Sequence, residues 1–225
     1  MTALFTQQRY CLGVALGARD AYTDNHCARV EALSLELGIQ CKLGAAELEL
    51  LSTAARLHDV GKIGIPDSIL LKPGRLDPSE WQTMKTHAVR GQEICQAIAH
   101  PDAKLIGIVV RHHHEAMDGS GYPDALSGEE IPLYSRIIRV ADCYDAMTTT
   151  RPHQPARPHE RVMEILRSEC GTKLDPAVFS HFEAIAFDRE RRTSFNSRPL
   201  VPKQPGIERR RPTLVARRTI KPLLS

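Results

Sequence analysis

Apolar residues recur along most of this chain at the spacing of an α-helix. From residue 20 to about residue 187, one apolar stripe follows another at intervals of three and four residues, and no segment alternates as a β-strand does. Gly38 and Gly61 follow the first two stripes and are expected to end those helices. The two stripes consist of His26, Val30, Leu33 and Leu37, and of Leu51, Ala54 and His58.

Capping signals predict where the later helices begin. Asp77-Pro78-Ser79-Glu80 combines an Asp N-cap, a Pro at the first helical position and a Glu at the third. The helix that follows is expected to continue through the stripe of His87, Gly91, Ile94 and Ile98 and to end before Pro101. Further helices are expected over 105–114, from Pro132 onward, over 157–169 and over 175–187. The sequence therefore predicts an all-α bundle.

Charge divides the chain into two parts. Residues 189–225 carry eleven Lys and Arg against Glu190 and Glu208, a local charge of +9, whereas the whole chain has a net charge of +3. The same segment holds five of the fifteen prolines and has no apolar period. We therefore expect one domain over 1–188 and a flexible basic tail over 189–225. The tail either contacts polyanions through its charge or is only solvated.

Composition excludes several classes of protein. A hydrophobic fraction of 42% and a charged fraction of 25% are typical of a globular domain. No run approaches the roughly 18 apolar residues of a spanning helix, and the N-terminus has no secretory signal, so a cytoplasmic location is expected. The six cysteines form no C-x-x-C pair and are expected to be reduced.

Histidines and an aspartate interrupt apolar stripes that should face the core. A single buried histidine is usually satisfied by ordinary hydrogen bonds, but several in one small domain are costly to bury unless they are paired or bind metal. The residues concerned are His26, His58, His87, His112, His113, His114 and Asp142.

The segment His58-Asp59-Val60-Gly61-Lys62 is the sharpest of these signals. Its two adjacent ligand-type side chains stand at a predicted helix end, and a carboxylate can bridge two cations through its two oxygens. Imidazole and carboxylate ligands without thiolate suit Fe, Mn, Co, Ni or Zn. Lys62 either offsets charge on a phosphate or complements the helix C-terminus.

Several segments of the chain resemble the motifs of a known family. The segment 58–62 is similar to the signature of the HD phosphohydrolase superfamily, and the segment 113–123 is similar to the motif of its HD-GYP branch. The segments 87–91, 136–152 and 171–176 fit the same branch in order and spacing. The resemblance covers roughly residues 19–185. It implies an HD-domain helical bundle and a bacterial phosphodiesterase that opens cyclic di-GMP to pGpG, and often on to GMP.

The resemblance also implies two divalent metal ions, with Fe or Mn favoured. A hydroxide shared by the two ions would attack phosphorus, and Lys62 and Arg151 would contact the substrate. Gly121, Tyr122 and Pro123 would shape the loop beside the site and contact other signalling proteins. His112 has no such role, and Asp145 either orients a ligand or is a surface acid. One ion would be held by His26, His58, Asp59 and Asp142, and the other by Asp59, His87, His113 and His114.

The chain departs from the family pattern at three places. His153 and Gln154 replace the usual Tyr and basic residue after Arg151-Pro152, although Arg157 could substitute for the lost base. Tyr22 stands where some members have a glutamate that supports a third metal, so two ions are expected. No sensory domain precedes the catalytic region, so the regulator is expected to be a separate protein or the tail.

Three interpretations follow from these features. The first is an active cyclic di-GMP phosphodiesterase. The second is an HD hydrolase of another nucleotide, such as cyclic GMP-AMP, which the altered segment 151–154 keeps open. The third is a binding module that keeps its metals for structure and signals through Tyr122-Pro123.

Overall fold

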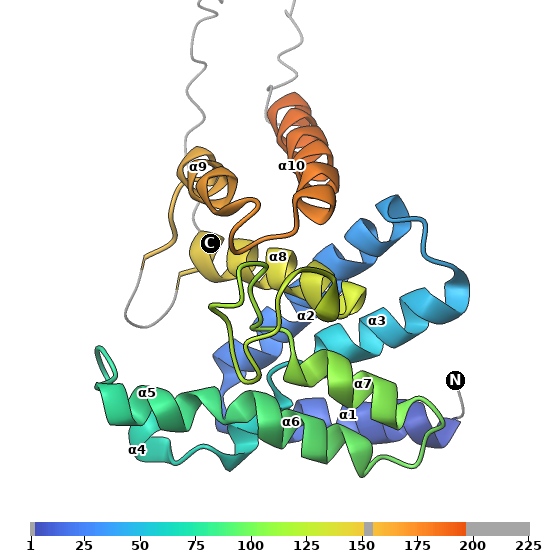
Figure 1. The fold of residues 1–225 in the computed structure, drawn as a ribbon, viewed down its shortest axis with the longest axis vertical. Coiled ribbons are helices and arrows are strands. Elements are labelled where there is room, and N and C mark those ends of the chain that lie inside the picture. The colour runs from blue at the N-terminus through green and yellow to red at the C-terminus, as the bar shows by residue number, and fades with distance from the viewer. Residues whose placement is uncertain (1–2, 151–154, 197–225) are drawn as a thin grey trace, which may run out of the picture.

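The computed structural model describes residues 3–150 and 155–196, with residues 3–6, 21–22 and 187–196 described in their backbone alone. Over these residues the chain is helical and contains no β-strand, which confirms the all-α prediction (Figure 1). The α-helices are α1 (Ala3–Arg19), α2 (Ala21–Gln40), α3 (Ala45–Leu57), α4 (Asp67–Leu70), α5 (Pro78–Lys85), α6 (His87–Gln96), α7 (Ala103–Arg111), α8 (Leu133–Thr148), α9 (His159–Glu169) and α10 (Pro176–Asn196). Two 3-10 helices complete the set, η1 (Val60–Gly64) and η2 (Gly128–Glu130).

Helix α2 is central to the bundle. It packs against α3 and α8, and α6 and α7 pack against each other beside α3 (Figure 1). α9 and α10 pack against α8, and α10 also contacts α2 (Figure 1). The predicted first stripe is confirmed as core, since Val30 and Leu37 are fully buried and Leu33 nearly so.

Helix α1 was not expected from the apolar pattern. Its buried apolar contact comes from Leu16, whereas Tyr10 and Val14 are exposed. The helix is held largely by polar contacts, such as that of the Arg9 guanidinium with the Glu31 carboxylate at 2.5 Å. Because a helix of this kind needs no apolar stripe, its sequence carries no clear periodic signal.

The long helix predicted from Pro78 towards Pro101 is in fact two helices. The Asp77 cap is confirmed, because its carboxylate accepts hydrogen bonds from Ser79 N and Glu80 N. At Thr86 the chain tightens, and the Thr86 amide bonds to the carbonyl of Thr83, three residues earlier. The break lets α5 stay on the surface while α6 turns inward and buries its first residue, His87.

The expected ends of the first two helices are corrected by two residues or more. α2 continues past Gly38 to Gln40, and α3 ends at Leu57, so that His58 follows its last turn. At Gly38 the absence of a side chain serves packing: a Cβ there would lie 2.8 Å from Leu48 and Leu51 of α3. Gly38 therefore allows two helices to approach each other instead of ending one of them.

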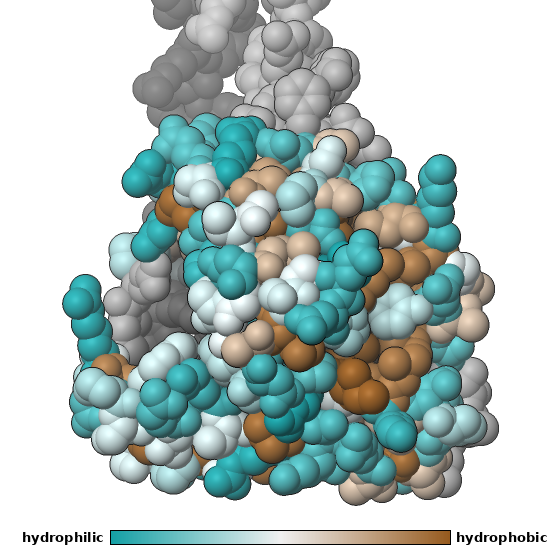
Figure 2. All heavy atoms as spheres, viewed as in Figure 1, coloured by the Kyte–Doolittle hydropathy of each residue, from teal (hydrophilic) through white to brown (hydrophobic). Residues whose placement is uncertain are grey.

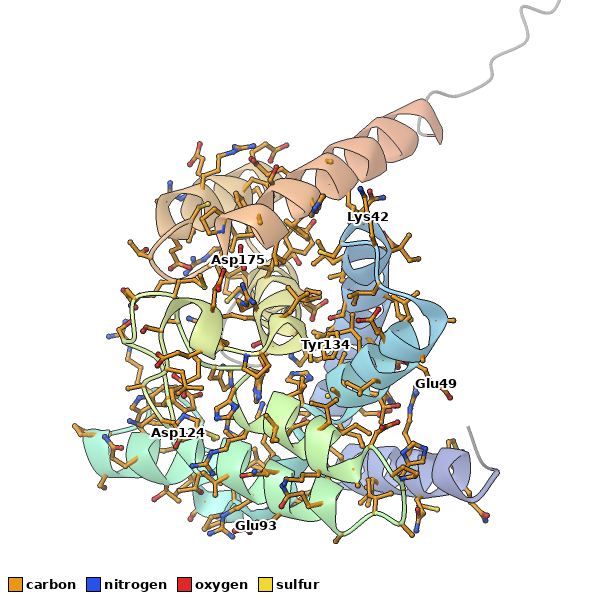
Figure 3. The ribbon with its side chains drawn as sticks, turned by 45° about the vertical axis from the view of Figure 1, so that its right-hand side comes forward. Lys42, Glu49, Glu93, Asp124, Tyr134 and Asp175 are labelled. Carbon is orange, nitrogen blue, oxygen red and sulfur yellow. The ribbon has the colours of Figure 1, made fainter. Side chains whose placement is uncertain are left out.

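Helix α10 begins where predicted and extends past the proposed domain boundary. Asp175 caps it by accepting a hydrogen bond from Ala177 N at 2.8 Å, and its other oxygen binds Arg136 Nη1 at 2.6 Å (Figure 3). The helix runs to Asn196, so residue 188 lies inside it. Residues 197–225 lie outside the described residues, and the basic tail stays a prediction.

The surface is mainly polar on the face seen in Figure 2. Hydrophilic side chains cover most of it, with hydrophobic ones gathered towards one side. Among the described residues, no helix combines the length and the apolar character that a membrane crossing requires.

Among the glycines of the described residues, Gly61 has the least room for a side chain. It lies in η1, and a Cβ placed on it would come within 1.9 Å of the His87 carbonyl oxygen and 2.5 Å of the Gly91 nitrogen. These are backbone atoms of α6, which cannot move away without shifting the helix. Gly61 therefore fixes the distance between the His58-Asp59 segment and His87.

We predict that Gly61→Ala displaces α6 and destabilises the fold by about 3 kcal/mol, because the added methyl group must be accommodated by backbone. Urea unfolding followed by circular dichroism measures the effect. Gly44→Ala is the matched control, since its Cβ would meet its nearest neighbour at 3.5 Å, and it should cost less than about 1 kcal/mol. Equal stabilities for the two variants would contradict the proposed close contact.

Candidate metal centre

Three histidines at helix ends are oriented by the same type of local hydrogen bond. Each Nδ1 lies close to the backbone carbonyl oxygen three residues earlier, and because a carbonyl only accepts, Nδ1 must carry the hydrogen. When such a ring is neutral, its lone pair lies on Nε2, which faces the interior. The pairs are His58 with Ala55 O at 2.8 Å, His87 with Met84 O at 2.8 Å and His113 with Val110 O at 2.6 Å.

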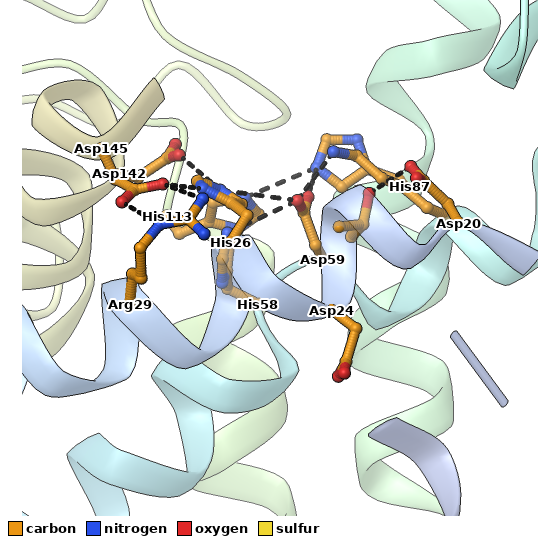
Figure 4. A network of polar contacts seen from close by, with 12 residues as sticks. Asp20, Asp24, His26, Arg29, His58, Asp59, His87, His113, Asp142 and Asp145 are labelled. Atoms are coloured by element: carbon orange, nitrogen blue, oxygen red, sulfur yellow. Dashed lines mark hydrogen bonds and ion pairs between the residues drawn. The ribbon is translucent and has the colours of Figure 1, made fainter. Parts of the chain in front are cut away.

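Asp59 lies between these histidines (Figure 4). Its carboxylate is only 2% exposed. One oxygen, Oδ1, lies 3.5 Å from His87 Nε2, and the other, Oδ2, lies 3.5 Å from His58 Nε2. Oδ2 also accepts a hydrogen bond from Lys62 Nζ at 2.7 Å. The two oxygens therefore face different histidines.

Asp59 belongs to two groups of potential ligands. In each group the candidate nitrogen and oxygen atoms all lie within 4.8 Å of one another. Asp142 adjoins both groups, with Oδ1 3.1 Å from His26 Nε2 and Oδ2 4.0 Å from His114 Nδ1. The structure therefore brings together all seven ligand-type residues predicted from the sequence. The first group is His26, His58 and Asp59, and the second is Asp59, His87, His113 and His114.

These residues fit a pair of divalent cations. His58 Nε2 is buried and has no hydrogen-bond partner among the described residues, which is costly for a polar nitrogen unless it binds a ligand. The surrounding donors are imidazole nitrogens and carboxylate oxygens, a set that suits borderline divalent metals. Asp59 presents Oδ2 to the first group of residues and Oδ1 to the second.

Burial and charge pairing set the protonation of the centre. Burial raises the pKa of Asp59, but the Lys62 ammonium and neighbouring histidines outweigh it and hold that pKa well below its usual range. Burial and the nearby His58 and His87 lower the pKa of His113 to about 3. At neutral pH Asp59 is therefore anionic and the His113 ring is neutral.

Asp145 orients His26. Its carboxylate is buried, and Oδ2 lies 2.7 Å from His26 Nδ1 (Figure 4). Arg29 binds both oxygens of Asp145, at 2.7 Å from Nε and 3.0 Å from Nη2. Of the two roles left open by the sequence, a surface acid is wrong because Asp145 is buried, and orientation of a metal ligand stays a prediction that the contact with His26 favours. The role of Arg29 was not predicted, because its partner lies 116 residues away along the chain.

Tyr122 of the predicted Gly-Tyr-Pro loop lies against the ligand-type histidines. Its ring centre is 4.8 Å from that of His114 and 6.4 Å from that of His87. Trp81 of α5 meets the same ring edge to face, at 6.1 Å. The Tyr122 ring therefore places this loop beside the ligand-type histidines.

Glu115 and Asp124 anchor that loop, and sequence reasoning missed both. The buried Glu115 carboxylate accepts hydrogen bonds from Asp124 N at 2.7 Å and Leu126 N at 3.2 Å. Asp124 binds Arg111 through both of its oxygens and His112 Nε2 at 2.8 Å. His112 thus stands outside the metal centre, as expected. Its cluster with the two acids forms ion pairs and backbone hydrogen bonds that hold the loop.

Some predicted residues cannot be placed. Arg151, His153 and Gln154 lie outside the described residues, as does the side chain of Tyr22. The backbone before His26 is helical from Ala21 onward, and the Asp24 carboxylate binds Arg56 Nη2 at 2.5 Å. Figure 4 shows Asp24 pointing away from Asp59.

Comparison with known proteins identifies the family. Residues 15–178 match the HD domain family. The chain is 40% identical over 164 residues to a cyclic di-GMP phosphodiesterase of Thermotoga maritima, covering 73% of this chain and 45% of that protein. It is 35% identical over 174 residues to 3'3'-cGAMP-specific phosphodiesterase 3 of Vibrio cholerae, covering 76% of this chain and 37% of that protein. The chain thus spans less than half the length of these relatives.

The fold is also found in a solved structure. The crystal structure of a cyclic GMP-AMP specific phosphodiesterase of V. cholerae superimposes with a TM-score of 0.63 at 18% sequence identity. The match covers 87% of this chain and 51% of that one. At this identity the likeness supports the fold, and it agrees with the predicted HD-domain bundle.

We predict that loading the metal-free centre with Mn²⁺ at pH 7.5 releases protons. Burial lowers the pKa of His26, but its hydrogen bonds to Asp142 and Asp145 outweigh this effect and raise the pKa to about 9. The ring is therefore protonated at pH 7.5 and must lose a proton before Nε2 can bind a cation. Apparent Mn²⁺ affinity should consequently fall as the pH is lowered below 9.

Isothermal titration calorimetry in two buffers of different ionisation enthalpy counts the released protons. Asp145→Asn is the matched variant, because it removes a carboxylate charge that raises the pKa of His26, and it should release fewer protons at pH 7.5. The same proton count in both proteins would contradict this assignment.

Proposed function

This chain belongs to the HD domain family, in its HD-GYP branch, and we propose that it is a metal-dependent phosphodiesterase of cyclic di-GMP. The observation that carries the proposal is the position of Asp59. This one buried carboxylate lies between two groups of histidines, and Lys62 binds it from the side. Such an arrangement suits hydrolysis of a phosphodiester better than a purely structural metal site, which needs no lysine at the shared ligand.

The residues divide between two proposed metal positions. Fe or Mn best fits the imidazole and carboxylate donors, and Zn, Ni and Co also match them. When bound, the divalent ions supply an activated water and offset the negative charge of the phosphate. His26, His58, Asp59 and Asp142 are proposed to hold one ion, and Asp59, His87, His113 and His114 the other.

The protein's own groups then orient and stabilise the reacting phosphate. Attack of water on phosphorus breaks the bond to the leaving 3′ oxygen, which takes up a proton, and opens the ring to pGpG. A second cleavage would give GMP. Lys62 is proposed to offset charge that develops on the phosphate oxygens, because its ammonium already lies at the shared carboxylate. Asp145 and Arg29 keep the His26 ring in its orientation throughout.

Residues outside the two metal positions are also proposed to take part in binding. Arg151 is proposed to bind a guanine or a phosphate. Gly121, Tyr122 and Pro123 are proposed to shape the edge of the site and to contact other signalling proteins. The basic tail is proposed to bind polyanions, and a cytoplasmic location accords with a nucleotide substrate.

Cyclic GMP-AMP is a second candidate substrate. The observation in its favour is the 35% identity to a relative named as specific for 3'3'-cGAMP. Both dinucleotides carry the same phosphodiester chemistry, so the metal centre does not distinguish them. Parallel assays of the Mn²⁺-loaded protein with the two dinucleotides, analysed by chromatography of the products, test both candidates. Turnover of neither would overturn the proposed function.

We predict that Asp59→Ala abolishes turnover, by about 1,000-fold or more, because the two metal positions lose the carboxylate that they share. Metal content measured by inductively coupled plasma mass spectrometry should fall in the same protein. Asp102→Ala is the control, since this carboxylate is exposed and lies away from the centre. Comparable turnover in Asp59→Ala and the control would exclude the two-metal mechanism.

We predict two metal ions per chain and not three. A third ion beside His26 would need a further carboxylate, yet Tyr22 occupies the position one turn earlier, and Asp24 is bound to Arg56. A phenol with a pKa near 10 is a poor ligand at neutral pH. Metal analysis normalised to folded chains should give a ratio near two. A ratio near three would refute the prediction, whereas a Tyr22→Glu variant that gains one ion would support its basis.

A further inference from the structure

The short helix η1 carries Lys62, and two other helices hold it in place. On one side, Gly61 lies directly against the backbone of α6. On the other side, η1 contacts α1, whose last residue is Arg19. η1 itself has only five residues and no side-chain cap at its start, and helices this short have little stability of their own. Its geometry therefore depends on its neighbours.

Arg19 binds the backbone of this segment through its whole guanidinium group. Nη1 donates to the carbonyl oxygen of Ile63, and Nη2 donates to that of Ile65. Nε and Nη2 also bind the Asp67 carboxylate, at 3.0 and 2.7 Å. Nη1 additionally lies 3.4 Å from the carbonyl oxygen of Lys62. One side chain thus binds carbonyls on both sides of the turn that follows Lys62.

This pattern needs the planar fork of an arginine. A guanidinium presents five N–H groups in fixed directions, whereas an ammonium offers a single compact point of attachment. The Arg19 side chain is 26% exposed, so the carbonyls that it binds are partly shielded from water that could replace it.

A second arginine on α1, Arg9, attaches the helix to the bundle through partners outside η1. Arg9 lies ten residues earlier and binds Glu31 of α2 at 2.5 Å and Ser52 of α3 at 3.2 Å. Neither of these two partners of Arg9 belongs to η1. Loss of Arg9 weakens the attachment of α1 to the bundle, whereas loss of Arg19 also frees the segment that carries Lys62.

We propose that Arg19 is a positioning residue for the reaction: by binding the carbonyls of Ile63 and Ile65 it fixes η1 so that the Lys62 ammonium reaches the phosphate beside Asp59. This inference rests on the proposed phosphodiesterase function. Arg19 itself contacts neither the ligand-type residues nor the phosphate. Its effect on turnover is therefore transmitted through Lys62.

A double-mutant cycle tests this dependence. Arg19→Met should lower kcat by about 10- to 100-fold with little change in KM, because a displacement of about 1 Å of a group that acts in the transition state has an effect of that size. Arg19→Lys should lie between the wild type and Arg19→Met. In a Lys62→Met background, Arg19→Met should change kcat by less than about twofold. Arg9→Met is the matched control and should keep wild-type kcat.

Two further measurements distinguish a positioning role of Arg19 from a loss of folding or of metal binding. Metal content should be the same in Arg19→Met and the wild type, because the ligand-type residues do not contact Arg19. Amide hydrogen exchange should accelerate over residues 60–65 in Arg19→Met and remain unchanged in Arg9→Met.

The outcomes distinguish the inference from the proposed function. Effects on kcat that multiply independently in the double variant would overturn the inference, even with an active wild type. If the wild type hydrolyses no cyclic dinucleotide, the proposed function fails, and hydrogen exchange still tests the support of η1. Unchanged exchange over residues 60–65 in Arg19→Met would overturn the inference in either case.

Discussion

The centre of this protein depends on one constraint, which is the burial of the Asp59 carboxylate. An anion shielded from water is stable only when nearby groups offset its charge. Here the Lys62 ammonium binds it directly, and the imidazoles of His58, His87 and His26 face its two oxygens. His58 and Lys62 belong to the same segment as Asp59, whereas His87 comes from α6 and His26 from α2. The arrangement of the helices can therefore be understood as the arrangement that surrounds this one carboxylate.

A position at a helix end restricts the orientation of a histidine side chain. At the end of a helix several backbone carbonyls have no partner within the helix, and a histidine there can donate Nδ1 to one of them. The donation fixes both the ring and the nitrogen that faces inward, as at His58 and His113. Contact between Gly61 and α6 then sets how closely two of these ends approach. Local hydrogen bonds and one tight backbone contact together produce a defined cluster.

The sequence was sufficient to predict the buried polar residues that lie on apolar stripes with helical spacing. His26 belongs to an apolar stripe, and His58-Asp59 stands at the end of another, so both could be recognised as buried polar residues. Long-range polar pairs leave no such pattern. Arg29 supports Asp145 from 116 residues away, and α1 docks largely through polar contacts, so neither was foreseen. The break at Thr86 was missed because no Gly or Pro lies between Pro78 and His87 to indicate the end of a helix.

A carboxylate shared between two cation positions makes their affinities interdependent. Under the proposed two-metal assignment, the first ion to bind neutralises part of the charge of Asp59, and the second enters a site with less negative charge and a cation nearby. By thermodynamic linkage, each ion weakens the other by the same factor. Loading then occurs in two steps, and the half-loaded protein persists over a range of metal concentrations. Under the same assignment, the activity proposed for this chain would respond to the concentration of free divalent metal over the range in which the weaker position fills.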